Sequence, residues 1–299
     1  MTTVQLDNLQ IRYHEIGEGP LVVLLHGYGG HASNLSAIGK SLAKNHRVVI
    51  PHLGILYRTQ PALTFAQQIR ILKKFMIHIN PYRESFHLFG TSYGGALSLG
   101  LRKEFASHVI SHTLVNPMPP APLTFINSKM LKFLFLCDRL PFCLGFLLKY
   151  KFGGSTLKKL GKIFHMGISG RRKIQHFNRR KYQLIKKALK RFVWILKSED
   201  WGPWEKEYSD LIPTLVVTSQ SDPIFTQEGY LKFRKLFKNV TIEELDDSSH
   251  MVAKWRPKKI SKLMRRQMKQ ALQMDTSAKR QMKISIARSQ LRLREEKVS

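Results

Sequence analysis

Short continuous runs of apolar residues recur along the chain and alternate with segments whose apolar residues are spaced as on one face of a helix. Runs of this kind are typical of strands that are buried on both faces. Alternating strands and helices predict an α/β fold with a mostly parallel sheet covered by helices. Residues 4–17 predict an antiparallel hairpin at one edge of that sheet. The apolar runs lie at 20–30, 47–53, 86–90, 110–117, 213–223 and 239–247.

One interval between two predicted strands interrupts this alternation. It begins with a proline-rich stretch and continues with apolar and basic segments of helical spacing. We therefore predict a core formed by residues 1–117 and 201–265, a basic helical cap inserted as residues 118–200, and a basic helical extension at 266–299. A single apolar stripe is expected in the cap, formed by Ile174, Phe177, Leu184, Ile185, Leu189, Phe192, Ile195 and Leu196.

A serine stands between two glycines directly after the predicted strand at 86–90, in the sequence Gly-Thr-Ser-Tyr-Gly. The following residues, 94–103, are typical of a helix that starts with small side chains. The turn between such a strand and helix must be sharp, and a side chain at its apex points outward. Ser92 is therefore a candidate nucleophile. The alternative is a glycine-serine turn without a catalytic role.

A serine hydroxyl needs a base to become a nucleophile, and the base needs an orienting acid. His250 follows the strand predicted at 239–245 through a short polar turn, and Asp222 lies in the loop that ends the preceding strand. Each residue alone has a plainer interpretation, as a turn residue before a proline or as a solvated surface histidine. Together, in the chain order Ser92, Asp222, His250 and at strand ends, they predict a catalytic triad.

Three other polar residues lie near these positions. Asp246 and Asp247 share the loop of His250, and we expect them to be turn residues. Asn116 follows the strand at 110–115, which is the other position where an acid could stand, and it carries no charge.

Acyl transfer also needs N–H donors for the oxyanion of the tetrahedral intermediate. The first long apolar run ends in the glycine turn HGYGG, residues 26–30. We predict that the backbone N–H groups of Tyr28 and Tyr93 are these donors, and that His26 is a structural residue of the turn.

With these segments in order, the chain resembles the α/β-hydrolase superfamily over nearly all of residues 4–265. The segments LLHGYGG, GTSYGGAL, SQSDPIF and SSHMV stand where that family has its oxyanion turn, nucleophile elbow, acid and histidine. The resemblance implies an eight-stranded sheet, a cap at 118–200, and two-step acyl transfer to water with no metal or cofactor. One departure is His52, which stands where many relatives carry an aspartate. Ser92 itself disfavours the branches with a carboxylate nucleophile, the dehalogenases and epoxide hydrolases.

The net charge of +30 is confined to two segments. Residues 129–197 hold 19 Lys and Arg against one acid, and residues 254–299 hold 15 against three. The rest of the chain is neutral, with 16 basic and 16 acidic residues. Basic helices with an apolar face suit docking on an anionic membrane. The plainer alternative is that the stripe packs on the sheet and the charge reflects a basic proteome.

These features predict a serine hydrolase that cleaves carboxylic esters or thioesters with an apolar acyl group. The alternative is a non-catalytic protein of the same fold that binds anionic lipid or another acidic partner through its cap and tail. No recognition motif accompanies the tail, so specific binding of nucleic acid is not expected. The first residues lack the basic start and apolar core typical of a secretory signal, and no run of about 20 apolar residues occurs. We therefore expect a cytoplasmic protein, with peripheral contact with a membrane as an option. Cys137 and Cys143 are expected to be buried thiols.

Overall fold

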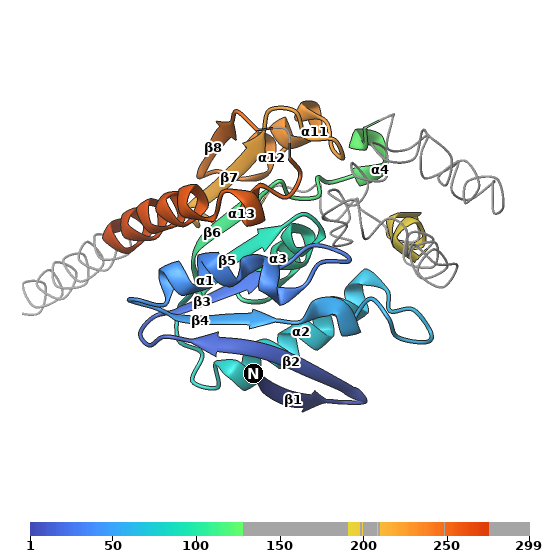
Figure 1. The fold of residues 1–299 in the computed structure, drawn as a ribbon, viewed down its shortest axis with the longest axis vertical. Helices are drawn as coiled ribbons and strands as arrows, with labels where there is room; N and C mark the ends of the chain where they lie inside the picture. The colour runs from blue at the N-terminus through green and yellow to red at the C-terminus, as the bar shows by residue number, and fades with distance from the viewer. Residues whose placement is uncertain (128–190, 198, 200–207, 209, 248, 275–299) are drawn as a thin grey trace, which may run out of the picture.

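A computed structural model describes residues 1–127, 191–197, 199, 208, 210–247 and 249–274 of the protein (Figure 1). Most of the predicted cap and extension lies outside these residues, as do both cysteines and the stripe residues before Phe192. The division into core, cap and extension therefore stays a prediction.

Eight strands form one sheet in the order β1-β2-β4-β3-β5-β6-β7-β8. The β1–β2 hairpin is antiparallel, and it pairs antiparallel with β4 at one edge; all other neighbouring strands are parallel. This confirms the predicted mostly parallel sheet with an edge hairpin. The strands are β1 (Thr2–Leu6), β2 (Leu9–Ile16), β3 (Leu21–Leu25), β4 (Arg47–Pro51), β5 (Phe86–Thr91), β6 (Val109–Val115), β7 (Thr214–Ser219) and β8 (Val240–Leu245).

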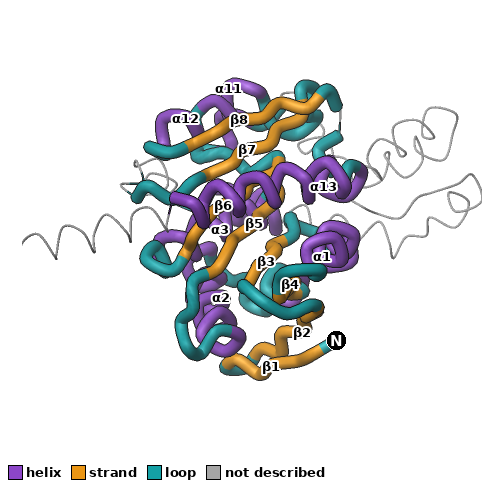
Figure 2. The backbone as a smooth tube through the Cα atoms, turned by 90° about the vertical axis from the view of Figure 1, so that its left-hand side faces the viewer, coloured by secondary structure: helices purple, strands orange, loops and turns teal. Residues whose placement is uncertain are grey.

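Helices cover both faces of the sheet (Figures 1 and 2). Alternate side chains of β3 enter two separate cores: Val23 packs with residues of α2 and α3, whereas Val22 packs with residues of α1. A strand buried on both faces gives a continuous apolar run, which is the pattern seen in the sequence. The helices include η1 (Ala32–Leu35), α1 (Ser36–Leu42), η2 (Leu53–Ile55), α2 (Phe65–Ile79), α3 (Tyr93–Glu104), α4 (Pro122–Phe125), α11 (Gln227–Leu231), α12 (Phe233–Leu236) and α13 (Val252–Trp255).

A helix over residues 257–274 packs against the second core. One side of this helix is apolar and buried, formed by Ile260, Leu263, Met264 and Met268. Nowhere in the described part of the chain is a helix both long and apolar enough to span a bilayer.

A buried arginine fixes the start of β7, where the chain returns to the sheet. Arg102, on α3, has no exposed surface and forms an ion pair with Asp210. Its guanidinium also donates to the Thr214 hydroxyl at 2.6 Å and lies 4.5 Å from the centre of the Phe237 ring. A fully buried arginine needs such a complete set of partners. The contacts hold β7 in place beside β6, and the loop after β7 carries Asp222.

Candidate active site

Ser92 lies between β5 and α3 with an unusual backbone conformation, φ 54° and ψ −129°. Positive φ is rare for a residue with a side chain, so neighbouring contacts must hold it. Its N–H donates to the carbonyl oxygens of Val115 and Asn116 at 3.2 and 3.1 Å. The turn also needs glycine at position 94, because a Cβ there would lie 2.5 Å from the Leu25 carbonyl oxygen.

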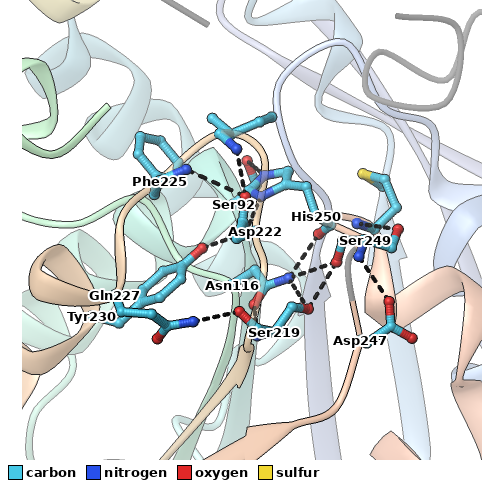
Figure 3. A network of polar contacts seen from close by, with 12 residues as sticks. Ser92, Asn116, Ser219, Asp222, Phe225, Gln227, Tyr230, Asp247, Ser249 and His250 are labelled. Carbon is cyan, nitrogen blue, oxygen red and sulfur yellow. Dashed lines mark hydrogen bonds and ion pairs between the residues drawn. The ribbon is translucent and has the colours of Figure 1, made fainter. Parts of the chain in front are cut away.

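The structure brings the three residues of the predicted triad together (Figure 3). The Oγ of Ser92 lies 2.8 Å from Nε2 of His250, and Nδ1 of His250 lies 2.7 Å from Oδ2 of Asp222. His250 and Asp222 are buried, whereas Ser92 is partly exposed. Because a carboxylate only accepts hydrogen bonds, Nδ1 carries the proton and Nε2 accepts from the serine hydroxyl. This is the arrangement in which an imidazole can remove the serine proton.

Asp222 has further partners that hold its carboxylate. The Tyr230 hydroxyl, on α11, donates to Oδ2 at 2.5 Å, and the backbone N–H groups of Ile224 and Phe225 donate to Oδ1 at 2.7 and 3.3 Å. Burial alone raises the pKa of the Asp222 carboxyl, but the electrostatic attraction of His250 and the donated hydrogen bonds outweigh burial and lower that pKa. The acid therefore stays ionised where it faces the imidazole.

The turn after β3 lies directly against the nucleophile. A Cβ at Gly27 would stand 2.8 Å from Cβ of Ser92, so only glycine allows this approach. Nδ1 of His26 donates to the Gly27 carbonyl oxygen at 2.9 Å, and Nε2 accepts from the Leu53 N–H at 3.0 Å. His26 therefore shapes the turn, as expected. The turn places Tyr28 near Tyr93, with ring centres 5.8 Å apart, while the donor role of their N–H groups stays a prediction.

Aromatic rings gather over this turn. The ring of Tyr28 lies 4.7 Å from those of Tyr57 and Phe192, and Arg191 donates to the Tyr57 carbonyl oxygen at 2.6 Å. Phe192 belongs to the helix at 191–197, within the predicted cap and its apolar stripe. No sequence pattern indicated Tyr57, which follows the short η2 turn. Part of the interval predicted as cap thus contacts the turn at residues 26–30.

The remaining polar residues near the triad have other roles. Asp247 accepts from the Ser249 N–H at 2.8 Å and Asp246 is exposed, as expected of turn residues. Asn116 is fully buried, and its side chain contacts the loop of His250. Sequence reasoning considered Asn116 only as a missing acid, and it missed Tyr230.

His52 is buried beside two other histidines. Its ring centre lies 5.0 Å from that of His14 and 4.5 Å from that of His31. Burial and the neighbouring histidines and Arg12 lower the pKa of His52 to about 4. Within the described residues, no group of three or more His, Cys, Asp or Glu side chains could hold a metal ion.

The strand order and the sharp turn at Ser92 are those of an α/β hydrolase. The chain belongs to the alpha/beta hydrolase family, whose sequence profile matches residues 22–254. Both the predicted superfamily and the predicted fold class are thus confirmed.

Several curated relatives are monoacylglycerol lipases. Monoacylglycerol lipase abhd6-B of Xenopus laevis is 24% identical over 265 residues, and monoacylglycerol lipase ABHD6 of Homo sapiens is 23% identical over 266 residues. Each alignment covers 83% of this chain and 75% of the relative.

Solved structures with the same fold include a membrane phospholipase A, described as a bacterial virulence factor, and a thermophilic esterase from Thermogutta terrifontis. The phospholipase has a TM-score of 0.65 and 20% identity, covering 90% of this chain and 86% of its own. The esterase has a TM-score of 0.61 and 15% identity, covering 91% and 99%. At this identity the likeness establishes the fold.

Proposed function

We propose that this protein is a serine hydrolase that cleaves carboxylic esters or thioesters of an apolar acyl group. The observation that carries the proposal is the continuous hydrogen-bonded path from Ser92 through His250 to Asp222. A serine, an imidazole and a buried carboxylate in this order are what acyl transfer to water requires.

In the proposed reaction, Oγ of Ser92 attacks the substrate carbonyl carbon while its proton passes to Nε2 of His250. The resulting imidazolium is stabilised by the Asp222 carboxylate and then protonates the leaving alcohol or thiol, which leaves an acyl group on Ser92. A water molecule attacks the acyl-enzyme, again giving its proton to His250, and the acid product departs as Oγ regains a proton. The N–H groups of Tyr28 and Tyr93 are the proposed donors to the oxyanion.

For the substrate, we propose a long-chain monoacyl glyceride. Relatives named as monoacylglycerol lipases support a lipid ester as the substrate, and so does a phospholipase A among the solved structures. The aromatic cluster of Tyr28, Tyr57 and Phe192 lies over the oxyanion turn and suits an apolar chain. A series of monoacylglycerols and acyl-thioesters of increasing chain length tests this choice: the highest kcat/KM should fall on a long-chain monoacylglycerol. A thioester preferred at every length would contradict it.

Covalent labelling by a fluorophosphonate probe tests the hydrolase itself. The native protein should be labelled, and Ser92→Ala should not. Ser98→Ala is the matched control, because Ser98 also lies 2.8 Å from a histidine, His112, but both residues are fully buried. Labelling that persists in Ser92→Ala, or that is absent from the native protein, would contradict the proposal.

We also propose peripheral contact with an anionic membrane through the helix at 257–274. Two features support it. No acidic residue lies among the described residues of the helix, and apolar side chains are exposed at Leu272 and Met274 and, just before the helix, at Trp255. Lys259 and Arg266 both pair with Glu243. The exposed basic residues are Lys258, Lys259, Lys262, Arg265, Arg266 and Lys269.

Co-sedimentation with phosphatidylcholine vesicles, with and without phosphatidylserine, tests this contact. Binding should need phosphatidylserine and weaken with salt. Because each basic residue near the surface contributes about 1 kcal/mol, Lys262→Ala with Lys269→Ala should weaken binding about 30-fold, and Gln270→Ala with Gln273→Ala should not. Equal binding to neutral vesicles would contradict the proposal. Vesicle binding without fluorophosphonate labelling would instead favour the non-catalytic alternative.

A further inference from the structure

Asn116 lies where three strand ends meet. It follows β6, between β5, which leads to Ser92, and β7, which leads to Asp222. Its backbone has φ 39°, a conformation that asparagine tolerates better than most residues. Its carbonyl oxygen accepts the Ser92 N–H at 3.1 Å, and its own N–H donates to the Val217 carbonyl oxygen at 2.8 Å. The main chain of Asn116 thus joins the nucleophile turn to β7.

The side chain of Asn116 reaches the third part of the site, the loop of His250 (Figure 3). Nδ2 lies 3.1 Å from the carbonyl oxygens of both Ser249 and His250 and 2.8 Å from the Ser219 hydroxyl. Oδ1 accepts the Ser219 N–H at 2.7 Å. Because carbonyl oxygens only accept and an N–H only donates, these partners fix which end of the amide is which.

We propose that the Asn116 carboxamide is a positioning residue that sets the distance between His250 and Ser92. This inference rests on the proposed hydrolase function. The side-chain hydrogen bonds of Asn116 go to Ser219 and to the carbonyl oxygens of Ser249 and His250. Asn116 thus acts through the backbone from which the His250 imidazole projects. Ser219 extends the same contact, because its hydroxyl accepts from Nδ2 and donates to the Ser249 carbonyl oxygen at 2.8 Å.

An amide fits this position and a carboxylate does not. In Asn116→Asp the side chain keeps its shape, but an oxygen faces the carbonyl oxygens of Ser249 and His250 where Nδ2 stood. The ionised form repels both carbonyls, whereas the protonated form can still donate its one O–H to one of them. Burial raises the pKa of a carboxyl, so the protonated form of the variant persists to higher pH than on the surface.

Steady-state hydrolysis of a soluble short-chain p-nitrophenyl ester tests the inference. For Asn116→Asp at neutral pH, kcat should fall about 10- to 100-fold, the effect of a small misplacement of reacting groups, with KM nearly unchanged. Asn80→Asp is the matched control: Asn80 is also buried and its amide also holds a backbone carbonyl, that of Glu84 at 2.7 Å, after α2. Its kcat should equal that of the native protein.

Two further readouts separate positioning from a loss of stability. The ratio of kcat in Asn116→Asp to native kcat should fall as pH rises, because ionisation removes the remaining donor. In a His250→Ala background, Asn116→Asp should leave the residual rate unchanged, because the residue through which Asn116 acts is gone. A native kcat in Asn116→Asp, a ratio independent of pH, or a further loss in the His250→Ala background would overturn the inference.

Ser219→Ala keeps the inference testable should Asn116→Asp not fold. Removing this hydroxyl breaks one of the links between Asn116 and the loop, and kcat should fall about 3-fold with KM unchanged. An unchanged kcat in Ser219→Ala would contradict the inference. A native protein that hydrolyses no ester would instead contradict the proposed function.

Discussion

The turn that carries Ser92 and the loops that carry Asp222 and His250 are built in different ways. Around Ser92, the decisive feature is glycine at two positions, because Cβ atoms at Gly27 and Gly94 would both overlap neighbouring atoms. Around Asp222 and His250, the decisive feature is donated hydrogen bonds, from Tyr230 and Asn116. The close approaches at Gly27 and Gly94 require the absence of a side chain, whereas the donors at Asp222 and at the His250 loop require particular polar side chains. We call the turn that carries Ser92 the nucleophile half of the site, and the loops that carry Asp222 and His250 the acid–base half. Substitutions in the two halves should therefore have different effects.

The largest effect should come from the acid–base half. In His250→Ala, kcat should fall about 10⁶-fold, because the serine has no base, and combining it with Ser92→Ala should add little to the loss. The fold should persist, since the Asp222 carboxylate keeps its hydrogen bonds from Tyr230 and two backbone N–H groups. Ester hydrolysis and urea unfolding measure both. A residual rate within about 100-fold of the native rate would show that His250 is not the base that activates Ser92.

The nucleophile half should fail in the opposite way, by losing stability. In Gly94→Ala the added Cβ would meet the carbonyl oxygens of Leu25 and His26 at 2.5 Å, and these are backbone atoms that cannot move aside. We expect the free energy of unfolding to fall by about 3 kcal/mol, at the upper end for an overpacked site. Gly54→Ala is the control, because a Cβ at that position would have no neighbour within 4 Å. Equal unfolding free energies for the two variants would show that the turn tolerates a side chain.

A smaller effect should follow from removing one donor to the acid. Tyr230→Phe removes the hydroxyl that donates to Oδ2 of Asp222. Hydrogen bonds to charged groups contribute about 1.5–3 kcal/mol, so kcat should fall by about 10- to 160-fold. Tyr208→Phe is the control, because the buried Tyr208 hydroxyl has no hydrogen-bond partner among the described residues. A kcat in Tyr230→Phe equal to that in Tyr208→Phe would show that Oδ2 of Asp222 needs no donor besides His250.

The same contrast explains which parts of the fold and of the site could be predicted from the sequence. The apolar runs predicted the sheet because each strand is buried on both faces. Gly-Thr-Ser-Tyr-Gly located the nucleophile because the serine and both glycines of the turn are found within five consecutive residues. Asp222 and His250 were identified by chain order and strand ends. Tyr230 and Asn116 were not recognised as partners. A hydrogen bond between residues 134 positions apart, such as that from Asn116 to His250, leaves no local pattern.

Acid should weaken the nucleophile half before it weakens the acid–base half. His87, on the strand that leads to Ser92, is buried, and its Nε2 has no hydrogen-bond partner among the described residues. Burial and the nearby His46 lower the pKa of His87 to about 4. The pKa of a histidine in the unfolded chain is about 6.5. Between these values the unfolded chain binds one more proton, so the free energy of unfolding falls as pH falls, by up to about 1.4 kcal/mol per pH unit.

Urea unfolding at pH 7 and at mildly acidic pH measures this slope. It should be shallower in His87→Gln, whereas His78→Gln, at an exposed site on α2, is the control. The Asp222 carboxyl has a lowered pKa, so its stabilising contribution is present above the ordinary aspartate pKa and is lost only at lower pH. A slope that is the same in His87→Gln and the native protein would assign the acid sensitivity to residues other than His87, and the two halves of the site would then not differ in this respect.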